Sequence, residues 1–295
     1  MNLKQAIAAT LVYFDIFDYP LTMDEIARWL PSSISFTRGR LLKLTKELVQ
    51  KRFLAQKEGF YFLPGRGEIV LKRRKNQEAS GPKLKIAQKA ARILIKMPGV
   101  LLVGLTGNLA LGDAQVGDDI DFLIITQRDK IWTARFLTVL LLEILGRRRR
   151  PKSKRIKDKI CLNLFLDEAY LHFGRNRQDL YTAHEVLQMR PLAGKGNIYQ
   201  RFLKANVWAK DFLPNAFREK MEMHKQNLEI FPKKCRSEGN FIEKVLASLQ
   251  LWYMKRRQTT EQVKKGQLFF HPRDKRQEIM AKYQEIMAGR YRNDD

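Results

Sequence analysis

The sequence has few of the residues that build disulfide scaffolds and multi-histidine metal centres. It contains two cysteines and four histidines among 295 residues. Two cysteines exclude a disulfide-rich scaffold and favour a reducing compartment. The histidines lie singly along the chain, without the spacing to the cysteines that zinc-binding motifs show. With 44% hydrophobic residues, the chain has enough apolar side chains to build its cores by packing alone, and we expect a cytoplasmic protein.

A long apolar run is also absent. The most apolar stretch, 131–145, contains Arg135 and Glu143 and is shorter than the roughly 20 apolar residues that a membrane span requires. The N-terminal segment does not have the pattern of a signal peptide. Asp15 and Asp18 interrupt its apolar run, and no small-residue cleavage site follows them. These features predict a protein without a membrane partner.

Acidic residues are scarce relative to basic ones. The chain has 56 Lys and Arg against 31 Asp and Glu, which gives a net charge of +25. Three blocks, 72–96, 147–159 and 255–292, carry net charges of +8, +8 and +7, and therefore nearly all of the excess. Such blocks favour a polyanionic partner, nucleic acid above all. For any single block, a solvated loop or helix face is the alternative.

The first 66 residues predict three helices followed by a β-hairpin. The expected elements lie, in order, at 3–18, 23–30, 36–52, 53–56 and 60–63. Thr22 and Glu25 form a capping box at the start of the second helix. This order is typical of a winged helix-turn-helix, whose third helix contacts the nucleic acid. The basic residues near the start of that helix are Arg38, Arg40, Lys43 and Lys46. A module that contacts protein is the alternative.

Beyond a linker at 64–67, the pattern changes to strands alternating with helices. Helices are expected on both sides of a break at 80–82. Three apolar strands and one helix follow at 100–106, 120–126, 160–166 and 133–145, and they predict an α/β sheet. From about 178 onward only helices are expected, at 179–189, 199–212, 215–229, 240–257 and 274–288.

The residues that carry chemistry follow the first of these strands. Gly107 and Asn108 form a glycine turn, and ten residues separate them from Asp119 and Asp121. Because alternate residues of a strand point the same way, the two carboxylates share a face. They repel each other unless a cation lies between them, and Mg²⁺ meets that need while it also binds substrate phosphates. The glycine turn offers backbone N–H groups to a triphosphate.

The segment 87–167 resembles the nucleotidyltransferase superfamily, which has the polymerase-β-like fold. The superfamily signature is Gly-Ser, about ten residues, and then Asp-x-Asp on the next strand. The whole chain resembles a bacterial group of the superfamily with an N-terminal winged helix. The resemblance implies an α+β fold: a winged helix over 1–66, a transferase α/β core with a small mixed sheet over 67–175, and a C-terminal helical bundle over 176–295.

The resemblance also implies an activity. A nucleoside monophosphate would move from a nucleoside triphosphate to an unknown acceptor. Gly107 and Asn108 would bind the nucleotide, and Asp119 and Asp121 would be the catalytic residues that hold Mg²⁺.

Two positions depart from the superfamily pattern. The signature serine is Asn108, whose amide still donates a hydrogen bond to a phosphate oxygen. The third metal position, a carboxylate on the following strand, aligns with Asn163, and Asp158 and Asp167 at the ends of that strand are its substitutes. Two carboxylates hold a second metal poorly and leave the acceptor without a base. The alternative function is therefore a non-catalytic protein that binds nucleic acid or nucleotide on a degenerate transferase core.

Overall fold

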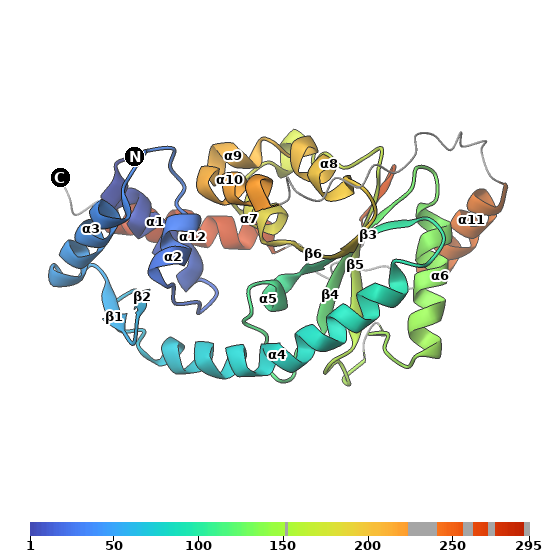
Figure 1. Cartoon of the computed structure of the whole chain (residues 1–295), viewed down its shortest axis with the longest axis horizontal. Helices are drawn as coiled ribbons and strands as arrows, with labels where there is room; N and C mark the ends of the chain where they lie inside the picture. The colour runs from blue at the N-terminus through green and yellow to red at the C-terminus, as the bar shows by residue number, and fades with distance from the viewer. Residues whose placement is uncertain (151–152, 224–240, 256–261, 271–274, 292–295) are drawn as a thin grey trace.

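In the computed structural model, one long helix joins an N-terminal helical unit to a core built on a β-sheet (Figure 1). The structure describes residues 1–150, 153–223, 241–255, 262–270 and 275–291. The fold is α+β with a mixed sheet, as expected. Within these ranges, no helix combines the length and the apolar character that crossing a membrane demands.

Three helices and a β-hairpin form the N-terminal unit, in the expected order. They are α1 (Leu3–Asp15), α2 (Met23–Arg28), α3 (Arg38–Gln50), β1 (Ala55–Lys57) and β2 (Phe60–Phe62). The capping box of Thr22 and Glu25 at the start of α2 is confirmed. The basic side chains near the start of α3 are exposed. The order of elements agrees with a winged helix, and that identity stays a prediction.

The joining helix, α4 (Glu68–Leu94), is continuous, so the break expected at 80–82 is wrong. Pro82 lies inside this helix and cannot donate a backbone hydrogen bond. Next to it, the Ser80 hydroxyl donates to the Asn76 carbonyl at 2.7 Å and accepts from the Ala114 backbone N–H at 2.9 Å. We infer that this contact with the core stabilises the helix at the point where Pro82 removes one of its backbone hydrogen bonds.

The core sheet has six strands in the order β6-β3-β4-β5-β8-β7. They are β3 (Val100–Thr106), β4 (Ile120–Thr126), β5 (Ile160–Asp167), β6 (Arg190–Gly194), β7 (Gln262–Lys264) and β8 (Gln267–Phe269). β3 and β4 are antiparallel, whereas β4 and β5 are parallel. The three strands expected from the sequence are thus confirmed, and they lie side by side.

The other three strands correct the expectation that 176–295 contains only helices. β6 includes Pro191, which the sequence pattern suggested as a helix break. It is an edge strand, and a proline is tolerated there because an edge residue can leave its N–H side unpaired. β7 and β8 form a hairpin that turns at Gly266, with φ +70°. This part of the chain therefore completes the sheet.

The remaining helices surround the sheet. They are α5 (Gly107–Ala110), α6 (Ile131–Ile144), η1 (Arg175–Arg177), α7 (Leu180–Gln188), α8 (Ile198–Ala205), α9 (Ala209–Phe212), α10 (Pro214–Met223), α11 (Phe241–Lys255) and α12 (Arg276–Tyr291). The helix expected at 199–212 is divided between α8 and α9. The ends expected for the helices at 215–229 and 240–257 lie outside the described residues.

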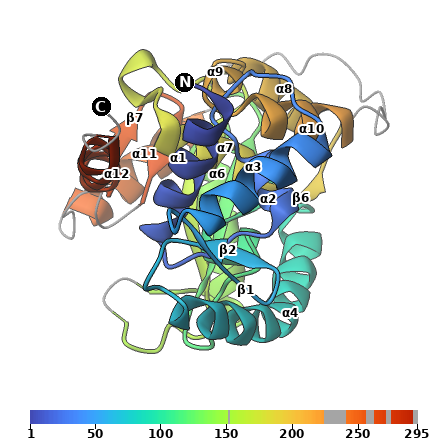
Figure 2. The same ribbon diagram turned by 90° about the vertical axis from the view of Figure 1, so that its left-hand side faces the viewer.

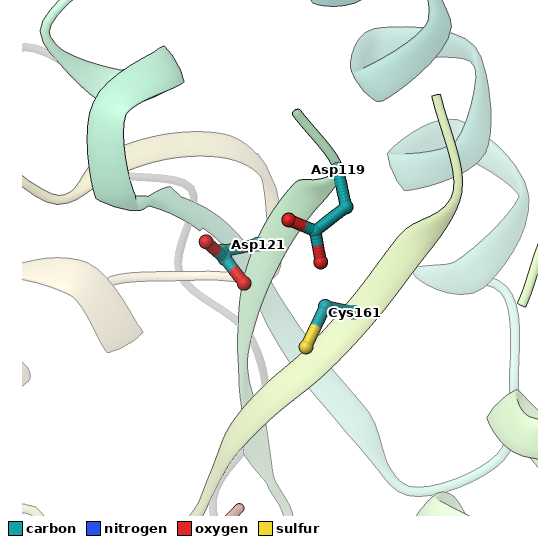
Figure 3. Close-up of side chains that lie close together, drawn as sticks. All are labelled: Asp119, Asp121 and Cys161. Atoms are coloured by element: carbon teal, nitrogen blue, oxygen red, sulfur yellow. The ribbon is translucent and has the colours of Figure 1, made fainter. Parts of the chain in front are cut away.

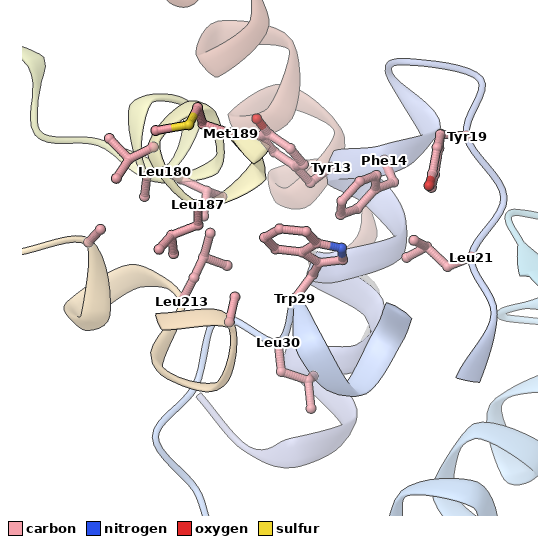
Figure 4. Packing of buried hydrophobic residues seen from close by; sticks show 14 of the residues in the cluster. Tyr13, Phe14, Tyr19, Leu21, Trp29, Leu30, Leu180, Leu187, Met189 and Leu213 are labelled. Atoms are coloured by element: carbon pink, nitrogen blue, oxygen red, sulfur yellow. The ribbon is translucent and has the colours of Figure 1, made fainter. Parts of the chain in front are cut away.

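The N-terminal unit packs directly on the core. Helix α12 lies beside α1 (Figure 2), and the aromatic side chains of Tyr13 and Phe14 on α1 and of Trp29, just after α2, lie on the side of α7 (Figure 4). The Tyr13 ring stacks on His184, with 4.1 Å between ring centroids, and Trp29 lies 5.1 Å from the same imidazole. Arg28 pairs with Glu219 of α10 at 2.7 Å. The N-terminal unit therefore forms a wall of the core.

Candidate functional site

A cavity of about 550 Å³ lies between the N-terminal unit and the sheet. The structure brings several of the expected site residues to its wall, together with an arginine from one of the basic blocks. These residues are Gly107, Asn108, Asp119, Asp121, Asn163 and Arg149. Helices α1 and α7 add aromatic and polar side chains, which include Tyr13, Phe14, Tyr181, Glu185 and Gln188. The cavity thus combines acidic, basic and aromatic groups.

Asp119 and Asp121 lie at the start of β4 and face each other (Figure 3). Their carboxylate oxygens and the Cys161 sulfur lie within 4.8 Å of one another. This proximity is what the alternation of side chains along a strand predicts for the two aspartates. Cys161 reaches the same point from β5, the parallel neighbour of β4.

The strand register gives Cys161 the place beside Asp121 that the sequence alignment assigned to Asn163. Asp121 is paired with Cys161, and the register shifts between Phe122 and Leu123, so that Asn163 is the additional residue on β5. Asn163 is buried on the cavity wall, two residues beyond Cys161. Such an irregularity changes which side chains face each other, and it cannot be recognised from the residues of a single strand.

Neither of the two substitute carboxylates joins the aspartate pair. Asp158 forms an ion pair at 2.7 Å with Lys83, a lysine of α4 that is only 3% exposed. Asp167 lies at the far end of β5, where its carboxylate accepts hydrogen bonds from the backbone N–H groups of Asp129 and Ala169. Both aspartates therefore stabilise the fold around them.

The glycine turn lies against the aspartates. Gly107 has φ +66°, in the region that favours glycine, and a Cβ at this position would lie 2.7 Å from Asp121 Oδ2. Asn108 follows it with an exposed side chain, and the Asn108 carbonyl accepts hydrogen bonds from the backbone of Leu111 and Asp113. The close approach of turn and carboxylate explains why glycine occupies position 107.

The charges at the site are unevenly compensated. Burial and the neighbouring charge of Asp119 raise the pKa of Asp121 to about 7. Arg149 Nη1 lies 2.7 Å from Asp119 Oδ2 and 3.6 Å from Cys161 Sγ. Burial, followed by the charges of Asp121 and Asp119, raises the pKa of the Cys161 thiol well above its ordinary value, so the sulfur stays protonated.

The donor set at this point suits a hard cation. Although Arg149 is close, Asp119 Oδ2 is buried and accepts no well-oriented hydrogen bond within the described ranges. Two carboxylates are typical ligands of Mg²⁺, which takes its other ligands from water and substrate phosphates. A protonated thiol is a poor ligand for Mg²⁺. Asp119 and Asp121 could therefore hold Mg²⁺, with Cys161 beside it and not bound to it.

Sequence reasoning did not identify Glu185 and Arg149 as parts of the site. Arg149 belongs to the basic run at 147–150, where nothing in the sequence distinguishes it from its neighbours. Glu185 follows His184 on α7, and burial together with the charge of Asp121 raises its pKa to about 7. The His184 ring itself is buried and stacked on Tyr13, and this burial lowers its pKa to about 3, so the imidazole is neutral.

No known family model matches the chain, and neither a curated protein nor a solved structure matches it. The site therefore has to be interpreted from its own geometry.

Proposed function

We propose that this protein is a Mg²⁺-dependent nucleotidyltransferase. The observation that carries the proposal is the pair of facing carboxylates, Asp119 and Asp121, next to the turn at Gly107 in a cavity of nucleotide size. Two carboxylates this close repel each other, and Arg149, the single cation beside them among the described residues, pairs only with Asp119. The backbone at Gly107 approaches these carboxylates closely and lines the same cavity.

In this proposal each part of the site has a separate task. Asp119 and Asp121 hold Mg²⁺, which when bound stabilises the negative charge on the triphosphate and on the departing pyrophosphate. Backbone N–H groups at Gly107 and Asn108 bind phosphate oxygens. Arg149 offers a further positive charge at the same wall, and the aromatic side chains of α1 exclude water from the cavity.

Substitution of the aspartates tests the proposal. In Asp119→Asn and Asp121→Asn we expect complete loss of transfer from the four α-labelled ribonucleoside triphosphates, with total RNA or a small-molecule cell extract as acceptor. Thermal unfolding should show an intact fold, because each variant removes one of two repelling charges and the pair that Asp119→Asn loses, with Arg149, is partly exposed. The exposed Asp211→Asn serves as the matched control. Unchanged transfer in both site variants would overturn the metal assignment.

A non-catalytic nucleotide-binding protein is the second candidate. It is favoured by Arg149, which places a permanent cation beside Asp119 and so partly replaces a metal ion. It is also favoured by Cys161, which stands on β5 where a third carboxylate would complete the site. Under this function, nucleotides would bind equally well with Mg²⁺ and with EDTA, and no label would be transferred. Binding that requires Mg²⁺ would favour the enzyme.

A further inference from the structure

The proposed transfer requires a group that takes the proton of the acceptor hydroxyl. Asp119 and Asp121 are occupied as metal ligands in the proposed function. Cys161 beside them keeps its proton, and the amide of Asn163 is not basic. Asp158 and Asp167 are held elsewhere in the fold. The strands of the sheet therefore supply no further base to the cavity.

Helix α7 does bring a carboxylate to the same cavity. Tyr181, Glu185 and Gln188 recur at the spacing of one helix face, and all three line the cavity that Asp121 lines. Helix α7 packs against α5, the short helix that begins at Gly107. Glu185 and Asp121 therefore line one cavity from two different elements, α7 and β4.

Glu185 also lacks the contacts that a structural carboxylate has. No hydrogen bond or ion pair joins its side chain to another group among the residues that the structure describes. By contrast, the partly buried Glu25, Glu143 and Glu168 each pair with an arginine. Leaving a desolvated carboxylate unpaired costs stability, and such groups are typical of functional sites. The cost is explained if the partner of Glu185 is a substrate.

We propose that Glu185 is the catalytic base for the acceptor hydroxyl, an inference that rests on the proposed nucleotidyl transfer. The acceptor O–H bond breaks, and its proton moves to the Glu185 carboxylate. The acceptor oxygen bonds to the α-phosphorus, and the bond from that phosphorus to the oxygen bridging to the β-phosphate breaks. Pyrophosphate leaves with this bonding pair, and the acceptor becomes a nucleoside-monophosphate ester. A pKa near 7 is well suited to this proton transfer.

The test compares Glu185→Gln and Glu185→Ala with the wild type and with Glu78→Gln, which makes the same chemical change on an exposed face of α4. The probes are the four α-labelled ribonucleoside triphosphates with Mg²⁺, and total RNA or a small-molecule cell extract as acceptor.

We expect Glu185→Gln to lower the transfer rate about 100-fold or more, the range of general base catalysis. Mg²⁺-dependent binding of the matching α,β-methylene nucleotide should remain at the wild-type level. Added formate, a small carboxylate base, should restore transfer in Glu185→Ala and leave Glu78→Gln unchanged.

Four outcomes would overturn the assignment. If Glu185→Gln transfers label nearly as fast as the wild type, Glu185 is not the base. If nucleotide binding is lost together with transfer, or formate restores nothing, Glu185 has a structural role. A wild-type protein that binds nucleotide with Mg²⁺ and transfers no label would instead refute the proposed function, and the assignment of Glu185 with it.

Discussion

At Gly107, backbone conformation and space constrain the site together. Replacement by alanine adds a Cβ at φ +66° and only 2.7 Å from Asp121 Oδ2. We expect Gly107→Ala to lower stability by about 1–2 kcal/mol, from the backbone strain and from displacement of Asp121. Mg²⁺ affinity should fall as well, because the displaced carboxylate no longer faces Asp119. Calorimetric titration with Mg²⁺ and denaturant unfolding measure the two effects.

Gly112 provides the matched control for this substitution. It has φ +70°, and a Cβ there would meet no atom within 4 Å. Gly112→Ala should therefore lose stability through backbone strain alone and keep the wild-type Mg²⁺ affinity. Equal Mg²⁺ affinities for the two alanine variants would show that the contact between Gly107 and Asp121 does not matter for the metal.

The positive charge of Arg149 lies where it would repel a metal ion bound to Asp119. Its guanidinium lies 2.7 Å from Asp119 Oδ2, and its side chain is 32% exposed. We expect Arg149→Met to tighten Mg²⁺ binding in the absence of nucleotide by about three- to tenfold, or ~1 kcal/mol, since a competing cation of a partly exposed pair is removed. The control is Arg148→Met, which removes a pair with Glu143 instead. Unchanged Mg²⁺ affinity in Arg149→Met would mean that Arg149 does not compete with the metal.

At the scale of whole elements, the sequence was most informative where the pattern is local. The strands at 100–106, 120–126 and 160–166 are apolar runs of the right length, and alternation along one strand was sufficient to bring Asp119 and Asp121 together. The partner of Asp121 could not be predicted in the same way, because it depends on register between two strands and on the irregularity after Phe122. β6 was missed because Pro191 resembles a helix break, and the context that permits it is tertiary.

Helix α4 is a second element in which tertiary contacts prevail over the local sequence pattern, and substitutions can test this directly. Pro82 lies in its interior, at a position where the sequence predicted a break. A proline inside a helix costs up to roughly 3 kcal/mol, and part of this cost is recovered because proline restricts the unfolded chain. We therefore expect Pro82→Ala to stabilise the protein by about 1–2 kcal/mol in denaturant unfolding. Gly81→Ala, at a position where a Cβ meets no atom within 4 Å, should stabilise by up to ~1 kcal/mol. A loss of stability in Pro82→Ala alone would show that the proline is needed for α4 to follow the core.

For the molecule as a whole, the basic blocks divide into internal and external parts. Arg73 is only 4% exposed, stacks on the Tyr19 ring at 3.6 Å and pairs with Glu25 at 2.8 Å. Lys83 is equally buried on Asp158, and Arg148 and Arg150 both pair with Glu143. These cations are paired with carboxylates of the same chain, so the net charge overstates what is offered to a polyanion. The part of the third block at 256–261, 271–274 and 292 lies outside the described residues.

An uncompensated stripe nevertheless follows the second half of α4. Lys85, Lys89, Arg92 and Lys96 recur every three or four residues, are exposed, and pair with no carboxylate in the part of the chain that the structure describes. On a helix this spacing puts the first three on one face, and Lys96 follows just beyond the end of α4. The basic residues of α3 are equally exposed, but Arg38 pairs with Asp24 at 2.9 Å. If the protein binds nucleic acid, the stripe on α4 is therefore the more favourable surface.

Salt dependence of nucleic-acid binding separates these two surfaces. For duplex DNA, each neutralised phosphate contributes about −0.9 to the slope of log affinity against log salt concentration. Replacing the four stripe residues by glutamine should reduce the magnitude of that slope by about 2–4, because each cation that contacts a phosphate releases counterions. The matched variant replaces Arg38, Arg40, Lys43 and Lys46 of α3, which removes the same charge, and it should change the slope by less than about 1.

A larger effect of the α3 variant would make the N-terminal unit the nucleic-acid surface, as a winged helix predicts. A wild-type affinity that does not depend on salt would show that neither surface binds phosphate.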